Sequence, residues 1–243
     1  MRYIRPFDRS VAGPPVETLV AAEEGVGCTM RLRRGAGSVD GADAGNDRFV
    51  LPLIGEATLR GAGGETVARA SELIVIPAGA PADVRVAGET LWLEVIAPLP
   101  DGARAQADHP AQVVAIDPSK WTEGGFAYQS LTDRSRGSQA LRMNILQVQP
   151  GSGSPDWHIH AFAQMYVILE GEMTIDIGRA RVTAGEGTLV IFPPGVVHRN
   201  FNASGAVERH VTFLVPEPAA DDIFDYAVTI HEHEAALLTS IPA

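Results

Sequence analysis

The chain has 243 residues, enough for one large domain or two of ordinary size, and 45% of them are hydrophobic. Its 30 acidic residues outnumber its 19 basic residues, which gives a formal net charge of −11. That charge would repel nucleic acid and anionic membrane surfaces, so neither is expected as a partner. No run of about 18 apolar residues and no signal-peptide core is present, so we expect a cytoplasmic protein without a membrane span.

Short segments rich in Val, Ile, Leu and aromatic residues, bounded by Gly, Pro and Asp, predict β-strands along the whole chain. In the first half we expect strands at Cys28–Leu32, Arg48–Ile54, Leu73–Ile76 and Leu91–Ile96. In the second half we expect them at Leu141–Val148, Gln164–Leu169, Leu189–Phe192 and His210–Val215. The poorly periodic stretch Pro118–Gly137 is interpreted as a lead-in loop, and the last 25 residues as a short helix or strand packed on the outside.

Two pairs of segments repeat along the chain. FVLPLIGEATL resembles MYVILEGEMTI, and LIVIPAG resembles LVIFPPG. The offset is the same in both pairs, because Gly55 and Gly171 are 116 residues apart and so are Pro77 and Pro193. Two matches at one offset indicate a tandem duplication.

Each copy holds roughly 100 residues with short, regularly spaced strands, which predicts an all-β fold of two jelly-roll barrels in one chain. Pro98, Pro100 and Pro110, with nearby Asp and Gly residues, mark the linker. We place the boundary near residue 110, with one domain at 1–110 and the other at 111–243. The two barrels are expected to pack about a pseudo-twofold axis, because each can cover sheet edges of the other. A homodimer is favoured, with a monomer as the alternative.

Histidines cluster in the second copy. Along an extended strand His158, His160, Phe162, Gln164 and Tyr166 would all point to one face. If that face is the barrel interior, two imidazoles and an amide converge there.

His198 adds a third imidazole to this group. It follows a Pro-Pro-Gly turn, and a hairpin from Gly187 to His198 would bring it back to the same place. Imidazoles without thiolates suit Zn, Cu, Fe, Ni and Mn. The alternative is a set of polar residues at a water-filled barrel mouth, but three of seven histidines on one face favour a metal site.

These residues resemble the two conserved motifs of the cupin superfamily. The second motif matches at all of its marked positions, namely Gly187, Pro193, Gly195, His198 and Asn202. The first motif matches at His158, His160 and Gly171, but Gln164 stands where the family usually has a glutamate ligand.

The resemblance implies two cupin barrels and one divalent transition metal per chain. The metal would be Fe, Mn, Ni, Co or Zn, with Fe or Mn favoured, and its ligands would be His158, His160, Gln164 and His198. At the 116-residue offset these positions fall on Ala42, Ala44, Arg48 and Ala82. The first barrel is therefore expected to be a degenerate scaffold without metal ligands. Arg48 is expected to be solvated or to bridge to the core, rather than to bind an anion.

The neutral amide of Gln164 would leave a divalent site with a charge of +2, which favours an anionic, chelating small-molecule substrate such as an enolate, a hydroxy acid or a catecholate. The pattern resembles three-histidine cupin dioxygenases, and we expect O2-dependent dioxygenation. It also resembles cupin hydroxynitrile lyases and the bicupin isomerase of bacilysin biosynthesis. A non-redox isomerase, lyase or cyclase is therefore the alternative, and a non-catalytic binding cupin the second alternative.

Other side chains are assigned lesser roles. Tyr166 is the candidate proton donor or hydrogen-bonding partner of the substrate, with a core tyrosine as the alternative. Trp157, Phe162 and Met173 are predicted to form apolar walls of the substrate pocket. His231 and His233 lie between acidic residues, in what we interpret as an exposed charged segment.

Overall fold

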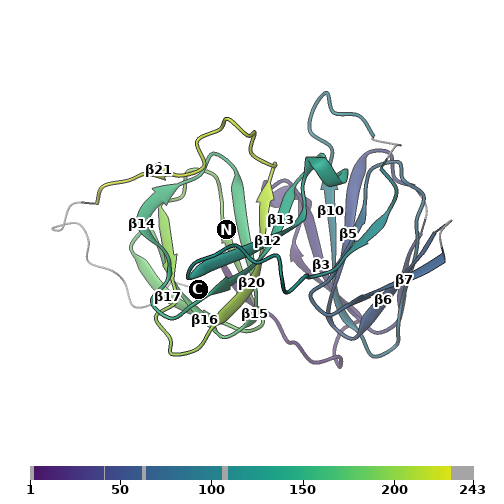
Figure 1. The fold of residues 1–243 in the computed structure, drawn as a ribbon, viewed down its shortest axis with the longest axis horizontal. Helices are drawn as coiled ribbons and strands as arrows, with labels where there is room; N and C mark the ends of the chain where they lie inside the picture. Colours follow the sequence, from purple (N-terminus) through teal and green to yellow (C-terminus); the bar gives the residue numbers. More distant parts are fainter. Residues whose placement is uncertain (1–2, 41, 62–63, 106–108, 231–243) are drawn as a thin grey trace.

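The computed structural model describes residues 3–40, 42–61, 64–105 and 109–230. Two β-barrels lie side by side, and the described helical structure consists of two short 3-10 turns, Ala22–Glu24 and Arg134–Arg136 (Figure 1). No helix among the described residues has the length and apolar character needed to cross a bilayer. His231 and His233 lie outside the described residues. The prediction of an all-β fold with two barrels is confirmed.

The first barrel is built from two facing sheets. Its strands are β2 (Val16–Val20), β3 (Thr29–Arg34), β4 (Gly37–Asp40), β5 (Asn46–Ile54), β6 (Glu56–Gly61), β7 (Gly64–Arg69), β8 (Leu73–Ile76), β9 (Asp83–Val86), β10 (Leu91–Pro98) and β11 (Gln112–Val114). The six-stranded sheet has the order β11-β8-β5-β10-β3-β2, and the four-stranded sheet has the order β4-β9-β6-β7.

The second barrel repeats this plan. Its strands are β1 (Ile4–Pro6), β12 (Phe126–Thr132), β13 (Arg142–Val148), β14 (Gly153–Ile159), β15 (Ala163–Glu170), β16 (Glu172–Ile177), β17 (Ala180–Gly185), β18 (Thr188–Phe192), β19 (His198–Phe201), β20 (Glu208–Val215) and β21 (Tyr226–Ala227). The sheet orders are β1-β18-β15-β20-β13-β12 and β17-β16-β19-β14-β21. The predicted lead-in loop at 118–137 is wrong in part, since β12 lies within it and pairs with β13.

The two repeats exchange their first strands. β1, at the start of the chain, pairs with β18 in the second barrel, and β11, at the start of the second repeat, pairs with β8 in the first. In Figure 1 the N-terminus accordingly lies on the second barrel. The boundary near residue 110 stays a prediction. On either side of it one short strand joins the other repeat's barrel, since β1 belongs to the second barrel and β11 to the first.

Matching glycines close matching hairpins. Gly55 lies between β5 and β6 with φ of 79°, and Gly171 lies between β15 and β16 with φ of 71°. A Cβ at Gly171 would lie 2.7 Å from the carbonyl oxygen of Val207, and one at Gly55 would lie 3.1 Å from that of Glu89. Positive φ and close backbone approach both require glycine, which explains why the sequence repeat retains it.

One apolar core joins the barrels, because the two six-stranded sheets face each other. Residues of both halves belong to the same buried cluster, including Leu32, Leu51 and Leu93 of the first and Ile145 and Met165 of the second. Each of these sheets turns alternate side chains to the shared core and to its own barrel interior. The homodimer stays a prediction.

In the first barrel an ion cluster occupies the region that corresponds to the predicted metal site. Arg48, aligned with Gln164, bonds to Oε1 of Glu94 at 2.9 Å, while Arg33 and Arg31 approach Oε2 at 2.6 and 3.6 Å. Glu94 is almost fully buried. Burial raises the pKa of its carboxyl, but the hydrogen bonds from Arg48 and Arg33 outweigh that effect and lower the pKa overall. Arg48 therefore bridges to a buried acid, as expected from the sequence.

Replacing this buried acid should destabilise the first barrel. Glu94→Gln leaves three arginines without their shared counter-charge, and we expect a loss of about 1–3 kcal/mol, below the cost of a fully buried pair because the arginines are partly exposed. Urea unfolding should show this loss above pH 4.5, the ordinary pKa of the acid, and it should shrink as the pH falls below that value and the wild-type carboxyl protonates.

The matched control is Glu65→Gln, which removes an exposed ion pair with Arg60. That change should cost at most about 0.5 kcal/mol. Equal stability losses in the two variants would contradict the role assigned to Glu94.

Candidate metal centre

The first motif lies where the chain crosses from one sheet of the second barrel to the other. His158 is near the end of β14, His160 lies in the bend that follows, and Gln164 is the second residue of β15. β14 and β15 belong to different sheets, so the single extended strand predicted for 158–166 is wrong. The three side chains still come together, because the bend forms a corner of the barrel and both strands turn these residues inward.

His198 completes the group from β19. It is the cross-strand partner of His158, and it follows a turn at 193–195 in which the N–H of Gly195 donates to the carbonyl of His160 at 2.9 Å. β18 and β19 lie in different sheets, so the predicted hairpin from 187 to 198 does not form. The turn instead ties the second motif to the first.

The three imidazoles form a compact triangle. Their ring centroids are 4.4 Å apart for His158 and His198, and 4.9 Å apart for each of the other two pairs. One ring nitrogen from each lies within 4.8 Å of the other two, and all three side chains are buried. This spacing is compatible with one shared ion.

Backbone carbonyls fix the tautomer of each ring. The Nδ1 atoms of His158, His160 and His198 lie 2.7–2.9 Å from carbonyl oxygens, those of Asp156, Phe224 and Val196 in the same order. A carbonyl only accepts, so each Nδ1 carries the proton and each Nε2 keeps a free lone pair. Fixing the ring through its other nitrogen is how proteins orient histidine ligands.

The free lone pairs fit a cation. Nε2 of His198 is buried without a hydrogen-bond partner among the described residues. Nε2 of His160 lies 2.9 Å from Oε1 of Gln164, although neither atom carries a proton in this tautomer. Two donors about 2.1 Å from a metal at a right angle are about 3.0 Å apart, so one ion would satisfy both.

Burial keeps two of these rings neutral. It lowers the pKa of His198 to about 3 and also lowers the pKa of His160. A neutral imidazole is the form that binds a metal. At pH 7 these two lone pairs are therefore available without the loss of a ring proton.

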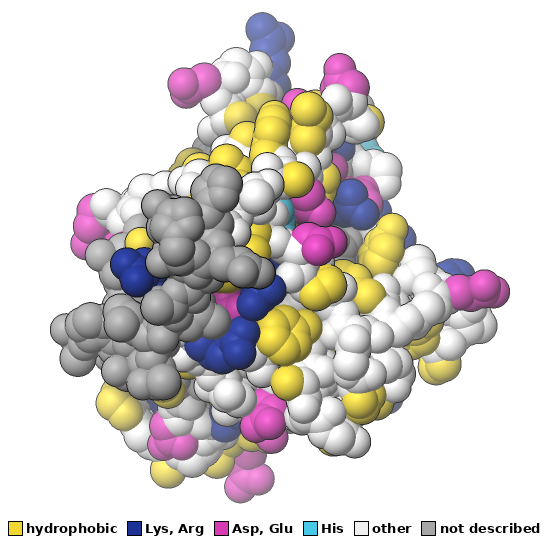
Figure 2. All heavy atoms as spheres, turned by 90° about the vertical axis from the view of Figure 1, so that its left-hand side faces the viewer, with side chains coloured by type: hydrophobic (Ala, Val, Ile, Leu, Met, Phe, Trp, Pro, Cys, Tyr) yellow, Lys and Arg dark blue, Asp and Glu magenta, His cyan; other side chains and the backbone are white. Residues whose placement is uncertain are grey.

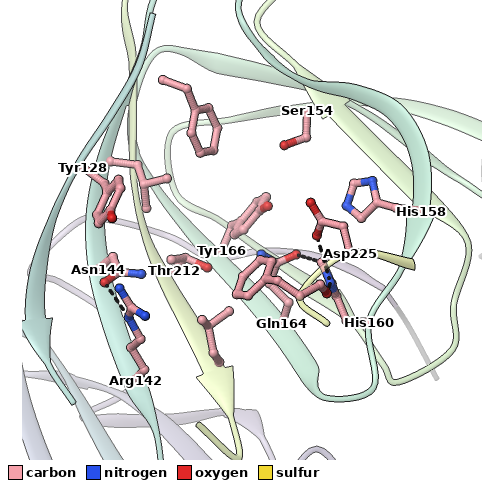
Figure 3. Close-up of a pocket in the computed structure, with 14 residues that line it drawn as sticks. Tyr128, Arg142, Asn144, Ser154, His158, His160, Gln164, Tyr166, Thr212 and Asp225 are labelled. Carbon is pink, nitrogen blue, oxygen red and sulfur yellow. Dashed lines mark hydrogen bonds and ion pairs between the residues drawn. The ribbon is translucent and has the colours of Figure 1, made fainter. Parts of the chain in front are cut away.

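A cavity of about 320 Å³ opens onto the cluster. Its lining comes from both sheets and from the segment after β20, namely Phe126, Tyr128, Arg142, Asn144, Leu146, Ser154, His158, His160, Gln164, Tyr166, Thr212, Leu214, Phe224 and Asp225. Figure 3 shows His158 and His160 at one side of this space and Tyr128, Asn144 and Arg142 at the other. Its volume is at the lower end of those of small-molecule sites.

Tyr166 lines the cavity at its buried side. Its hydroxyl accepts a hydrogen bond from Nδ2 of Asn200 at 3.2 Å. Burial, and then the charge of Glu208, raise the pKa of this hydroxyl, so it stays protonated. In its resting state Tyr166 can therefore donate a hydrogen bond into the cavity but cannot act as a base.

The three predicted apolar wall residues lie outside the cavity lining. Trp157 precedes His158 and so points to the opposite face of β14, where it stacks under Arg199 at 4.6 Å. Phe162 stacks on His160 with ring centroids 4.7 Å apart, and Met173 is fully buried in the apolar cluster inside the second barrel. We correct the prediction accordingly, with Phe126, Leu146, Leu214 and Phe224 as the apolar wall.

The segment after β20 contributes residues that the sequence did not reveal. Phe224 supplies the carbonyl that orients His160, and Oδ1 of Asp225 lies 3.4 Å from Nδ1 of the same ring. From the side of β14 and β21, only small areas of histidine are visible among hydrophobic and acidic side chains (Figure 2). This stretch was interpreted as outer packing, but Phe224 and Asp225 form part of the rim of the site.

Fold and site together define a protein of two β-barrels whose described residues contain one histidine cluster, in the second barrel. Residues 144–213 match the family model described as Cupin domain. A glyoxylate-induced protein from Pseudomonas aeruginosa has a similar fold, with a TM-score of 0.66, 16% identity and coverage of 86% of this chain and 83% of that one. The second barrel thus contains a segment that matches the cupin family, and the chain as a whole shares the fold of this structure.

Two enzymes are also among the similar structures. Oxalate decarboxylase from Lactobacillus farciminis has a TM-score of 0.61 at 12% identity, over 94% of this chain and 89% of that one. A variant of salicylate 1,2-dioxygenase from Pseudoaminobacter salicylatoxidans has a TM-score of 0.63 at 9% identity, over 82% and 76%. No curated protein matches by sequence.

Metal analysis of purified variants tests the cluster. Wild-type protein purified without chelator should hold about one divalent transition metal per chain. His158→Ala or His198→Ala should lose most of it, because each removes one of three oriented imidazoles, while circular dichroism stays that of a folded β-protein.

His109→Gln is the matched control, since His109 is remote from the cluster in sequence and is not among the three grouped histidines. It should retain the metal. Two tightly bound ions per chain, or no ion after expression in metal-rich medium, would show that the site is wrongly assigned.

Proposed function

We propose that this protein is a metal-dependent enzyme that acts on a small, oxygenated organic substrate bound directly to its metal. His158, His160, His198 and Gln164 would hold one divalent first-row ion, with iron or manganese favoured. One observation carries the proposal. The three histidines meet at one buried place beside the cavity, which His158 and His160 line. Each has its Nδ1 hydrogen-bonded to a carbonyl, which leaves Nε2 for an ion.

The proposed ligands carry no negative charge, so they would leave a divalent ion with its full +2 charge. A glutamate in place of Gln164 would cancel one unit. A charge of +2 in a largely buried site strongly favours an anionic chelator, such as an enolate, a hydroxy acid or a catecholate. The substrate would thus bring the negative charge that the ligands lack.

The reaction we propose is O2-dependent dioxygenation of this substrate. A bound iron or manganese ion would supply Lewis acidity and one-electron chemistry. Phe126, Leu146 and Leu214 would contact the carbon skeleton, and the Tyr166 hydroxyl would donate a hydrogen bond to a substrate oxygen. The fold similarity to salicylate 1,2-dioxygenase supports this choice of reaction.

A non-redox isomerase, lyase or cyclase is the second candidate, and Asp225 is the observation that favours it. Its carboxylate lines the cavity beside His160, and its side chain is about half exposed. There it could accept a proton from a substrate carbon acidified by the metal and return it to another atom. A positioned base of this kind contributes about 10²–10⁴ in rate.

Turnover under air and under nitrogen distinguishes these candidates. We would screen diketones, catechols and keto acids, measuring both oxygen uptake and product. Dioxygenation predicts turnover in air and none under nitrogen. Activity that persists under nitrogen rules dioxygenation out in favour of the second candidate, and activity absent in both atmospheres across the panel would indicate a non-catalytic binding protein.

Two substitutions refine the assignment. Gln164→Glu should bind metal more tightly, and oxygen uptake at saturating substrate should stay within about tenfold or rise, because the added donor eases metal oxidation. Asp225→Asn should change a dioxygenase by less than about tenfold, but should slow an isomerase or lyase by about 100-fold or more.

The control for the charge change is Gln149→Glu, at an exposed position in the turn after β13. It should leave metal affinity and turnover unchanged. If Gln164→Glu does not alter metal affinity any more than this control does, Gln164 is not a ligand.

A further inference from the structure

The wall of the cavity opposite the histidines carries a positive charge. Alternate residues of β13 face the cavity, and the first of them is Arg142. Gln164 on β15 pairs with Leu214 on β20, and Leu214 pairs with Arg142, so these three residues form one row across the sheet. Two strand spacings separate the ends of this row by about 10 Å between Cα atoms. Arg142 is thus positioned for a part of the substrate other than the part bound to the metal.

The guanidinium of Arg142 is oriented but not neutralised. Its Nε donates to Oδ1 of Asn144 at 3.2 Å, and Arg142 forms no ion pair with any residue that the structure describes. Its two terminal nitrogens carry four N–H groups, and none of these has an acceptor among the residues that the structure describes. By contrast, Arg48, which is aligned with Gln164 in the first barrel, has Glu94 as its carboxylate partner.

The acids nearest to this wall are engaged elsewhere. Asp225 lies beside His160, on the opposite side of the cavity in Figure 3. The carboxylate of Glu217, close enough to Arg142 to be influenced by its charge, accepts a hydrogen bond from the backbone N–H of Arg134 at 2.9 Å. Glu208 bonds to Nδ1 of His210 at 2.9 Å, fully buried. None of these acids forms an ion pair with Arg142.

Neutral donors flank the guanidinium. Asn144 uses its Oδ1 to accept from Arg142, which leaves its amide N–H groups for a ligand, and the hydroxyl of Tyr128 lines the same wall (Figure 3). A planar guanidinium with amide and hydroxyl donors matches the two oxygens of a carboxylate. One positive charge with two neutral donors suits a monoanion better than a phosphate dianion.

We propose that Arg142, positioned by Asn144 and assisted by Tyr128, binds a carboxylate of the substrate at the end remote from the metal. This inference rests on the proposed function and narrows its substrate class. The substrate is a small carboxylic acid whose chelating oxygens lie several bonds from the carboxylate, with a size limited by a cavity of about 320 Å³. The apolar side chains between the two ends contact its carbon skeleton.

Three catechols test this proposal on metal-loaded protein by calorimetry. 3,4-Dihydroxybenzoate carries both a chelating pair of hydroxyls and a distal carboxylate, 3,4-dihydroxybenzamide is its neutral counterpart, and catechol lacks the distal group. Wild-type protein should prefer the benzoate to the benzamide by about 10- to 100-fold, the usual strength of a hydrogen-bonded charge pair. Arg142→Gln should abolish the preference and leave the affinities for benzamide and catechol unchanged. Arg142→Lys should restore part of it.

Arg209→Gln is the matched control, because Arg209 pairs with exposed Glu170 and does not line the cavity. It should keep the full preference and the metal. Equal binding of benzoate and benzamide by wild type, or a preference that survives Arg142→Gln, overturns the role of Arg142 while leaving the metal site intact. If none of the three probes binds, or if catechol binds equally well without metal, the proposed function fails and this inference fails with it.

Discussion

The apolar core between the two barrels determines which side chains reach the cavity. Met143, Ile145 and Phe213 are buried in that core, while their neighbours Asn144 and Thr212 face the cavity. Strand alternation links the two faces, since a slip of one residue in any of these strands would exchange core and cavity residues. The cost of exposing several large apolar side chains therefore holds the polar side chains of the site in register. The first barrel contributes to the site through this shared core.

Backbone atoms do much of the orienting inside the site. Three carbonyls hold the Nδ1 atoms of the imidazoles, and two of them, those of Asp156 and Val196, lie two residues before the histidine they orient. The third belongs to Phe224, 64 residues away from His160. Local turns therefore place two rings, whereas the third also depends on the segment after β20, which forms part of the rim of the cavity. The orientation of this proposed ligand therefore depends on a contact with the rim of the cavity.

Features with a local cause could be predicted from the sequence. All eight expected strands are present, because alternation and turn residues are local signals, and the repeat at an offset of 116 residues correctly indicated two barrels. The grouping of His158, His160 and His198 was also correct, although it depends on a barrel corner rather than on one continuous strand.

Features that depend on distant pairing could not be predicted. In the sequence Arg142 is only a polar residue at the start of a predicted strand. Its position opposite Gln164 follows from the pairing of β13 with β20 and of β20 with β15. The prediction that Trp157 lines the pocket was wrong because adjacent residues of a strand face opposite ways. Trp157 therefore points away from the cavity that its neighbour His158 lines. Phe224 and Asp225 gave no signal, since their role arises from contact with a histidine far away in sequence.

Anomalous diffraction at the absorption edge of the copurified metal tests the central claim most directly. The account predicts one strong anomalous peak per chain, bounded by His158, His160 and His198, about 2.0–2.2 Å from their Nε2 atoms and within reach of Oε1 of Gln164. A peak elsewhere in the chain, or coordination through Nδ1 with the three carbonyl contacts broken, would contradict it.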